Sequence, residues 1–123
     1  MRRILYDHTG APQHYLTGAG IVYDLTHTPV GTLQETQLLN RQGRVVGWFE
    51  GAFAWNASGV LAFVKGAAPE GELTLPQTMP LRVKLAPTPA PLCPLLVRAE
   101  PPPLVWRWAE GTLADALTTS LGT

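Results

Sequence analysis

The sequence predicts a mainly β protein in which four tandem β-hairpin repeats surround a shared core, closed by a proline-rich strap and a short C-terminal helix. Three observations indicate this fold class: a turn unit that recurs along the first half of the chain, a sharp rise in proline after Ala68, and one capped apolar stretch near the end. With 123 residues the chain fits one domain with a modest core. We expect residues 1–68 to form the hairpins, 69–108 to form the strap packed on them, and 109–123 to form the helix and tail.

The turn unit consists of an Asp or Asn, the turn anchor, followed three residues later by glycine in three of four copies. The copies recur about every 16 residues. An anchor at the first position of a type I turn accepts a hydrogen bond from the backbone two residues on, and glycine at the fourth position adopts the left-handed conformation that forms a bulge. Apolar and aromatic residues at strand spacing flank each turn, so each copy predicts one hairpin. The turn residues are Asp7 with Gly10, Asp24 with His27, Asn40 with Gly43, and Asn56 with Gly59.

The repetition itself has a physical reason. A single hairpin of this length is only marginally stable in water. Several copies in a ring or a stack can bury their apolar faces against one another, so that each copy supplies one segment of a common core. His27 stands where the other three copies have glycine, so the second turn departs from the pattern.

The composition changes after Ala68. Of the 12 prolines, only Pro12 and Pro29 precede this point. Leu, Val and Met separate many of the later prolines, whereas proline linkers are usually polar, so we expect a packed strap in preference to the alternative, a mobile linker. Its prolines would also block further pairing at the strand edges. The alternating stretch 81–85 is typical of a paired strand.

The last segment predicts a helix of about two turns. Thr112 is a suitable N-cap, and Asp115 three residues later nearly completes a capping box. The apolar face of this helix would consist of Leu113, Ala116, Leu117 and Leu121.

Four hairpin turns in register, followed by a proline strap and a late pair of tryptophans, resemble the bacterial 4-fold beta flower proteins. The segments YDHTG, YDLTHTPVG, NRQGRVVGWFEGA and NASGVLAFVKGA carry the resemblance over residues 4–67, and the strap and the 106–108 segment extend it to nearly the whole chain. His27, Asn40 and Asn56 depart from the preferred residues, which affects the expected turn geometry and not the architecture. The family is uncharacterised, so the resemblance implies a fold and no activity. Alternative architectures are a small barrel of the PRC type found in ribosome maturation factors and, more distantly, the YD-repeat shells.

Charge and cysteine content exclude several classes of function. The formal net charge is zero, and the scattered basic residues do not form the cluster that phosphate neutralisation needs, so we do not expect a nucleic-acid partner. Cys93 is the only cysteine, which excludes an intrachain disulfide and a cysteine zinc site. No apolar run reaches the roughly 18 residues of a membrane span and no secretory leader is visible, so we expect no membrane association and a cytoplasmic location.

No residue pattern indicates catalytic, cofactor-binding or metal-binding residues, and we expect no cofactor. His8 and His27 fall at turn positions and His14 on a strand, and all three are expected to be exposed. Asp7 and Asp24 could be imagined as a carboxylate pair, but their turns already explain them.

The tryptophans are the candidate interaction residues. Packing in the core is the favoured explanation for them, but a tryptophan left exposed in a groove would make a binding site. They are Trp48, Trp55, Trp106 and Trp108.

These observations favour a non-enzymatic binding or assembly module, with an unknown protein partner or self-association into a homo-oligomer. The alternative is a small enzyme with a site at the hub of the hairpins or at a subunit interface. A polar pocket that holds a histidine beside Asp7 or Asp24 would favour the enzyme, and a flat apolar patch around a tryptophan would favour the module.

Overall fold

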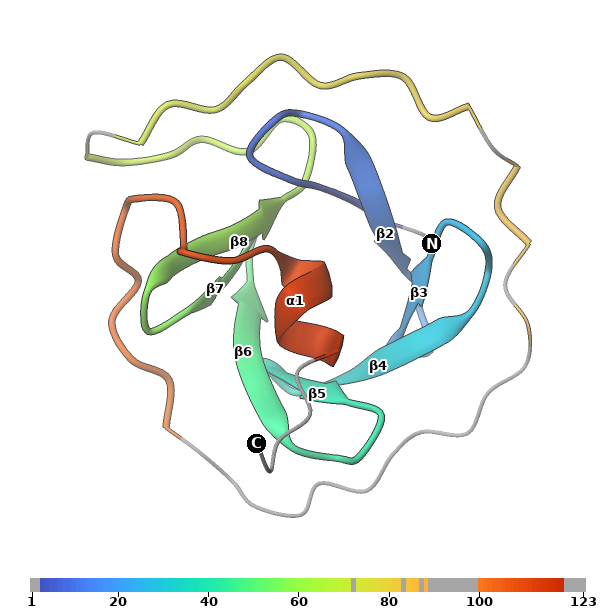
Figure 1. The fold of residues 1–123 in the computed structure, drawn as a ribbon. Coiled ribbons are helices and arrows are strands. Elements are labelled where there is room, and N and C mark those ends of the chain that lie inside the picture. The colour runs from blue at the N-terminus through green and yellow to red at the C-terminus, as the bar shows by residue number, and fades with distance from the viewer. Residues whose placement is uncertain (1–2, 72, 83, 87, 89–99, 119–123) are drawn as a thin grey trace.

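The computed structural model describes residues 3–71, 73–82, 84–86, 88 and 100–118. At its centre is a closed barrel of antiparallel strands, in which every strand pairs with the next along the chain and β8 pairs back with β1 (Figure 1). The predicted fold class, mainly β with one short C-terminal helix, is confirmed. The strands are β1 (Arg3–Tyr6), β2 (Pro12–Leu16), β3 (Ile21–Asp24), β4 (Pro29–Gln34), β5 (Gln37–Asn40), β6 (Val45–Glu50), β7 (Phe53–Asn56) and β8 (Gly59–Phe63), and the helix is α1 (Leu113–Thr118).

The four sequence repeats correspond to the hairpins β1–β2, β3–β4, β5–β6 and β7–β8. In the first three turns, the fourth residue donates its backbone N–H to the anchor carbonyl and has a positive φ, which is 85° at Gly10, 69° at His27 and 83° at Gly43. The fourth turn is tighter, because Asn56 pairs directly with Gly59, whose φ is 142°. In all four turns, a side-chain oxygen of the anchor accepts the backbone N–H two residues on, as an Asx turn requires.

Each hairpin contributes one equivalent cross-strand pair of residues to the interior of the barrel. The residue on the second strand is small, glycine or alanine, in three of the four copies, and it lies opposite an apolar residue of the first strand. The small residue leaves room for the core: a Cβ added to Gly31 would lie 2.8 Å from Leu117 Cδ2 of α1. Leu113 and Leu117 are buried in the same cluster as the strand residues, so α1 fills the barrel core (Figure 1). The pairs are Leu5 with His14, Val22 with Gly31, Leu38 with Gly47, and Ala54 with Ala62.

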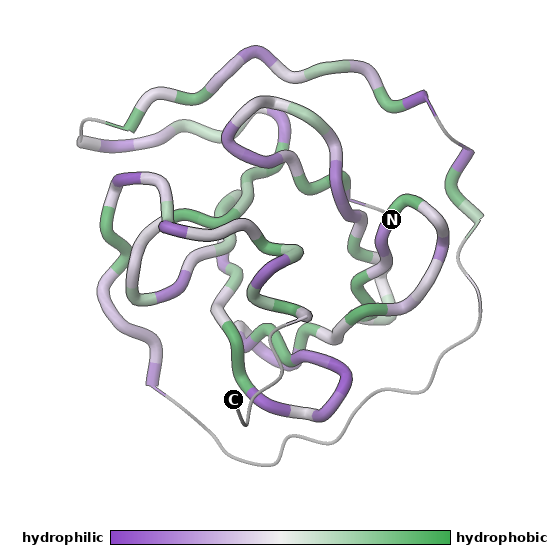
Figure 2. Tube along the Cα trace, viewed as in Figure 1, coloured by the Kyte–Doolittle hydropathy of each residue, from purple (hydrophilic) through white to green (hydrophobic). Residues whose placement is uncertain are grey.

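The described parts of the strap lie outside the ring of strands (Figure 1), and Figure 2 shows apolar residues along them as well as along the strands. Leu73 is 7% exposed in a cluster with barrel residues. The Trp106 ring stands perpendicular to that of Phe53 at a centroid distance of 5.0 Å. The described residues of the chain therefore form two apolar layers, one inside the barrel with α1 and one between the barrel wall and the strap.

The strap contacts the barrel at successive turns. Met79 donates its backbone N–H to the Gly10 carbonyl at 2.8 Å, which fastens the strap to the first turn. Further on, the backbone N–H of Ala86 donates to Nδ1 of His27 at 3.3 Å, in the second turn. The predicted strand at 81–85 is wrong for residues 81, 82, 84 and 85, which pair with no strand, and Val83 lies outside the described residues.

Helix α1 begins with the predicted capping box. The Thr112 N–H donates to Asp115 Oδ2 at 3.0 Å, and the Asp115 N–H donates to Thr112 Oγ1 at 3.2 Å. Among the described residues, no helix has the length and apolar character needed to cross a membrane.

Candidate functional site

The candidate site arises where one repeat breaks the interior pattern. His14 occupies the place that Gly31, Gly47 and Ala62 hold in the other hairpins. Its side chain is only 4% exposed, although a buried polar side chain normally needs hydrogen-bond partners. The first hairpin therefore has a buried imidazole at a position where the other three hairpins have only glycine or alanine.

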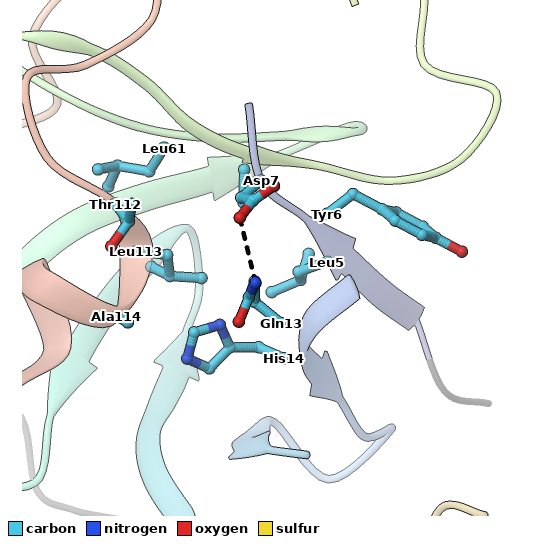
Figure 3. A pocket seen from close by; sticks show the side chains of 10 residues that line it. Leu5, Tyr6, Asp7, Gln13, His14, Leu61, Thr112, Leu113 and Ala114 are labelled. Atoms are coloured by element: carbon cyan, nitrogen blue, oxygen red, sulfur yellow. Dashed lines mark hydrogen bonds between the residues drawn. The ribbon is translucent and has the colours of Figure 1, made fainter. Parts of the chain in front are cut away.

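Beside this imidazole lies a pocket of about 150 Å³, which we call the α1 pocket (Figure 3). Gln13 and Ala114 are exposed and form its rim, whereas His14 and Leu5 are buried and form its base. The pocket thus opens to solvent between the first hairpin and the start of α1. Its lining residues are Leu5, Tyr6, Asp7, Gln13, His14, Leu61, Ala62, Thr112, Leu113 and Ala114.

Asp7 gives the α1 pocket a negative charge. Partial burial raises the pKa of its carboxyl, but hydrogen bonds from Thr9, Ala11 and Gln13 outweigh burial and hold the pKa below 3.8. Oδ1 accepts from the Thr9 N–H at 2.9 Å, the Thr9 hydroxyl at 2.6 Å and the Ala11 N–H at 3.2 Å. Oδ2 accepts only the amide of Gln13, at 3.1 Å, among the described residues (Figure 3). Asp7 is therefore ionised at neutral pH, and one of its oxygens has spare acceptor capacity.

His14 is uncharged at neutral pH. Burial lowers the pKa of its imidazole to about 4, against the attraction of Asp24, its cross-strand neighbour on β3, which raises it. Nδ1 is buried and has no hydrogen-bond partner among the described residues. An unpaired buried polar atom costs free energy, so it needs an explanation such as an absent ligand or water.

A second hollow of about 390 Å³ lies away from α1, between the β2–β3 turn and Glu35. It is larger, but Arg3, Gly18, Ala19 and Glu35 in its lining are all exposed. A surface hollow of this kind lacks a buried polar group that a ligand would satisfy, so the smaller α1 pocket is the better candidate.

The expected exposure of the histidines holds for His8 and is wrong for His14, which is buried. His27 is half-buried. Its Nδ1 lies 3.0 Å from the Tyr15 hydroxyl and accepts the Ala86 N–H, so this side chain links the second turn to the strap. His27 thus has a structural role that glycine could not fill. The signal that would have revealed His14 was present in the repeats, since the residue seven places after the anchor is His14 in the first copy and glycine in the next two.

The tryptophans lie on the barrel wall and under the strap. Trp55 is 7% exposed and donates from Nε1 to the Pro102 carbonyl at 3.1 Å. Trp48 pairs with Trp55 across β6 and β7 and is half-buried. Trp106 and Trp108 are also half-buried, and Trp108 packs on Phe63 at a centroid distance of 6.0 Å. None of these four residues forms the flat exposed patch that would favour a tryptophan-based binding module.

The remaining predicted turn residues do not line the α1 pocket. Asn40 is fully buried, and its Oδ1 accepts the N–H groups of Gln42 and Arg44, both at 3.0 Å. The described part of the chain holds no group of three or more potential metal ligands.

A closed meander barrel of four hairpins, with a helix in its core and a polar pocket beside that helix, defines the class of this protein. The chain belongs to the 4-fold beta flower protein family, whose model matches residues 3–117. A search of curated proteins and a search of solved structures each find no significant match.

Proposed function

We propose that this protein is a non-enzymatic binding protein that holds a small ligand in the α1 pocket. The observation that carries the proposal is the buried imidazole of His14 at a position where three repeats use glycine or alanine. Stability alone would favour the small residue, because a buried polar side chain without a partner is destabilising. A ligand that bonds to the polar base of the pocket would offset this cost.

The geometry favours binding over catalysis. A histidine that acts as a general base usually has its second nitrogen bonded to a carboxylate or carbonyl, which fixes the ring and its tautomer. Nδ1 of His14 has no such partner among the described residues. Asp7, the carboxylate in the same pocket, bonds to Thr9, Ala11 and Gln13 and not to this histidine.

The second candidate function is a small enzyme, and one observation supports it. The α1 pocket places an uncharged imidazole near an ionised carboxylate, which is the combination that a proton-transfer site requires. An enzyme would lose turnover in His14→Gln while its substrate still bound, whereas a binding protein would show no turnover to lose.

A fragment screen by protein NMR tests the binding proposal. We expect at least one small fragment, from a set that includes cations, anions and neutral molecules, to shift the backbone amides of 5–7, 13–14 and 112–114 together. Ala114→Tyr should block these shifts, because it fills the rim of the pocket from the exposed side of α1. Thr118→Tyr is the matched control, since it places the same side chain at an exposed position of the same helix. The proposal is wrong if no fragment of any charge shifts these amides in the unmodified protein.

A further inference from the structure

The residues that line the α1 pocket carry a net negative charge. Asp7 carries the single charge among its lining residues, which include neither lysine nor arginine, and the imidazole of His14 is neutral at pH 7. A site with one carboxylate and no compensating cation attracts a positively charged ligand and repels an anion.

The unused hydrogen-bonding capacity points the same way. Gln13 donates its amide N–H to Asp7 Oδ2, which leaves the Gln13 carbonyl oxygen without a partner among the described residues. Asp7 Oδ2 itself can accept a further bond, because a carboxylate oxygen offers about two lone pairs. Two adjacent acceptors therefore lie at the mouth of the pocket, and a group with several N–H donors satisfies both.

The size and the remaining wall of the pocket limit the rest of the ligand. Leu5, Leu61 and Leu113 supply an apolar surface beside the polar groups (Figure 3). A dry cavity near 150 Å³ can hold a molecule about as large as benzene, with roughly six non-hydrogen atoms. The body of the ligand is accordingly short and apolar.

We infer that the α1 pocket takes a small organic cation, with a primary ammonium group at Asp7 and Gln13 and a short apolar body against the leucines. This inference rests on the proposed binding function and adds the chemical class of the ligand. His14 forms the polar base of the pocket, where a water enclosed by the bound ligand bonds to its Nδ1.

Three probes of matched length test the inference: butylammonium, 1-butanol and butyrate, each titrated at pH 7.5 while the backbone amides are followed by NMR. We expect butylammonium to saturate the shifts of 5–7, 13–14 and 112–114 with an affinity about fivefold above that of butanol, as one partly exposed charge pair allows. Butyrate should bind more weakly than butanol.

Asp7→Asn should remove this preference and make butylammonium and butanol bind equally. The substitution keeps the turn, because Asn40 and Asn56 anchor the third and fourth turns with the same side-chain oxygen contacts. Asp24→Asn is the matched control, since it makes the same change at the second turn; its carboxylate acts on His14 but does not line the pocket, so most of the preference should remain.

Two results would overturn the inference and leave the binding function standing: butanol or butyrate binding at least as tightly as butylammonium in this pocket, or an unchanged preference in Asp7→Asn. If neither these probes nor any fragment of the wider screen shifts the pocket amides, the binding function fails as well.

Discussion

His14 makes the stability of the protein sensitive to pH in a defined window. Its pKa is about 4 in the folded protein and near 6.5 when unfolded. Between these pH values, His14 is therefore protonated in the unfolded chain and uncharged in the folded protein. Titration of His14 therefore does not reduce the free energy of unfolding above pH 6.5. As the pH falls from 6.5 towards 4, this free energy decreases by up to about 3 kcal/mol.

His14→Ala should remove this decline, because alanine occupies the equivalent place in the fourth hairpin and does not titrate. Chemical denaturation at pH 7 and at pH 5 measures the effect, and His8→Ala, at an exposed turn position, serves as the control. A pH dependence that survives in His14→Ala would show that another group causes it. Asp7 and Asp24, whose pKa values are lowered, act in a different window, since their contribution is lost only below about pH 4.

His27 fits its turn conformation less well than glycine would, but its side chain attaches the strap to the second turn. Its φ of 69° lies in the left-handed region, which favours glycine, yet its ring accepts the Ala86 N–H. We expect His27→Gly to relax the turn while the amide of Ala86 exchanges with solvent at least about tenfold faster, because it loses its acceptor. The amide of Met79, bonded to Gly10, is the internal reference in the same hydrogen-exchange experiment. Equal exchange at Ala86 in both proteins would mean that the strap is held there by packing alone.

At the scale of elements, the turn glycines serve two separate requirements. Gly10 and Gly66 have nearly the same φ, 85° and 87°. A Cβ at Gly10 would collide with the Gln77 carbonyl of the strap, whereas a Cβ at Gly66 would meet nothing within 4 Å. Glycine at the first turn is thus required by its conformation and also by the close approach of the strap.

This pair separates conformational strain from steric collision. Gly66→Ala should cost about 1 kcal/mol, the cost of left-handed backbone for a residue with a side chain. Gly10→Ala should cost at least about 1 kcal/mol more, because the strap must also move. Thermal or urea unfolding of the two variants gives the comparison, and equal losses would show that the strap adjusts without cost.

The hairpins and the helix could be predicted from the sequence, because each depends on local rules: an Asx turn, a bulge glycine and a capping box. The pocket could not, because it depends on which positions meet inside the closed barrel. His14 lies on a strand that looks half-polar as Pro12–Leu16, and only the register that places it opposite Leu5, next to α1, makes it buried. The path of the strap escaped prediction for the same reason, since its contacts to Gly10 and His27 join residues far apart in sequence.

At the scale of the whole molecule, the outer apolar layer predicts that barrel and strap fold as one unit. Trp106→Ala should lower stability by about 2 kcal/mol, less than a fully buried tryptophan would, because Trp106 is half-buried against Phe53. Val105→Ala is the matched control, since the side chain of Val105, next to Trp106 in the sequence, is 36% exposed, and its truncation should cost under about 0.5 kcal/mol.

Truncation after Ala68 tests the same unit more severely. It removes α1 from the barrel core and Leu73, Leu104 and Trp106 from the barrel wall, and so exposes two apolar faces at once. We expect an aggregated or unfolded product by size-exclusion chromatography and circular dichroism. A soluble fragment with a cooperative melting transition would show that the strap is a dispensable linker.

The order of the elements along the chain also sets the order in which a ribosome releases them. Each strand pairs with its predecessor, so hairpins can form as they emerge, but the barrel gains its inner and outer apolar partners only when α1 and the strap follow. Helix α1 leaves the ribosome only after the whole strap, yet Thr112, Leu113 and Ala114 make one side of the pocket. A nascent chain therefore has strands long before it has a complete α1 pocket, and interrupted synthesis leaves the apolar face that α1 would cover open to aggregation.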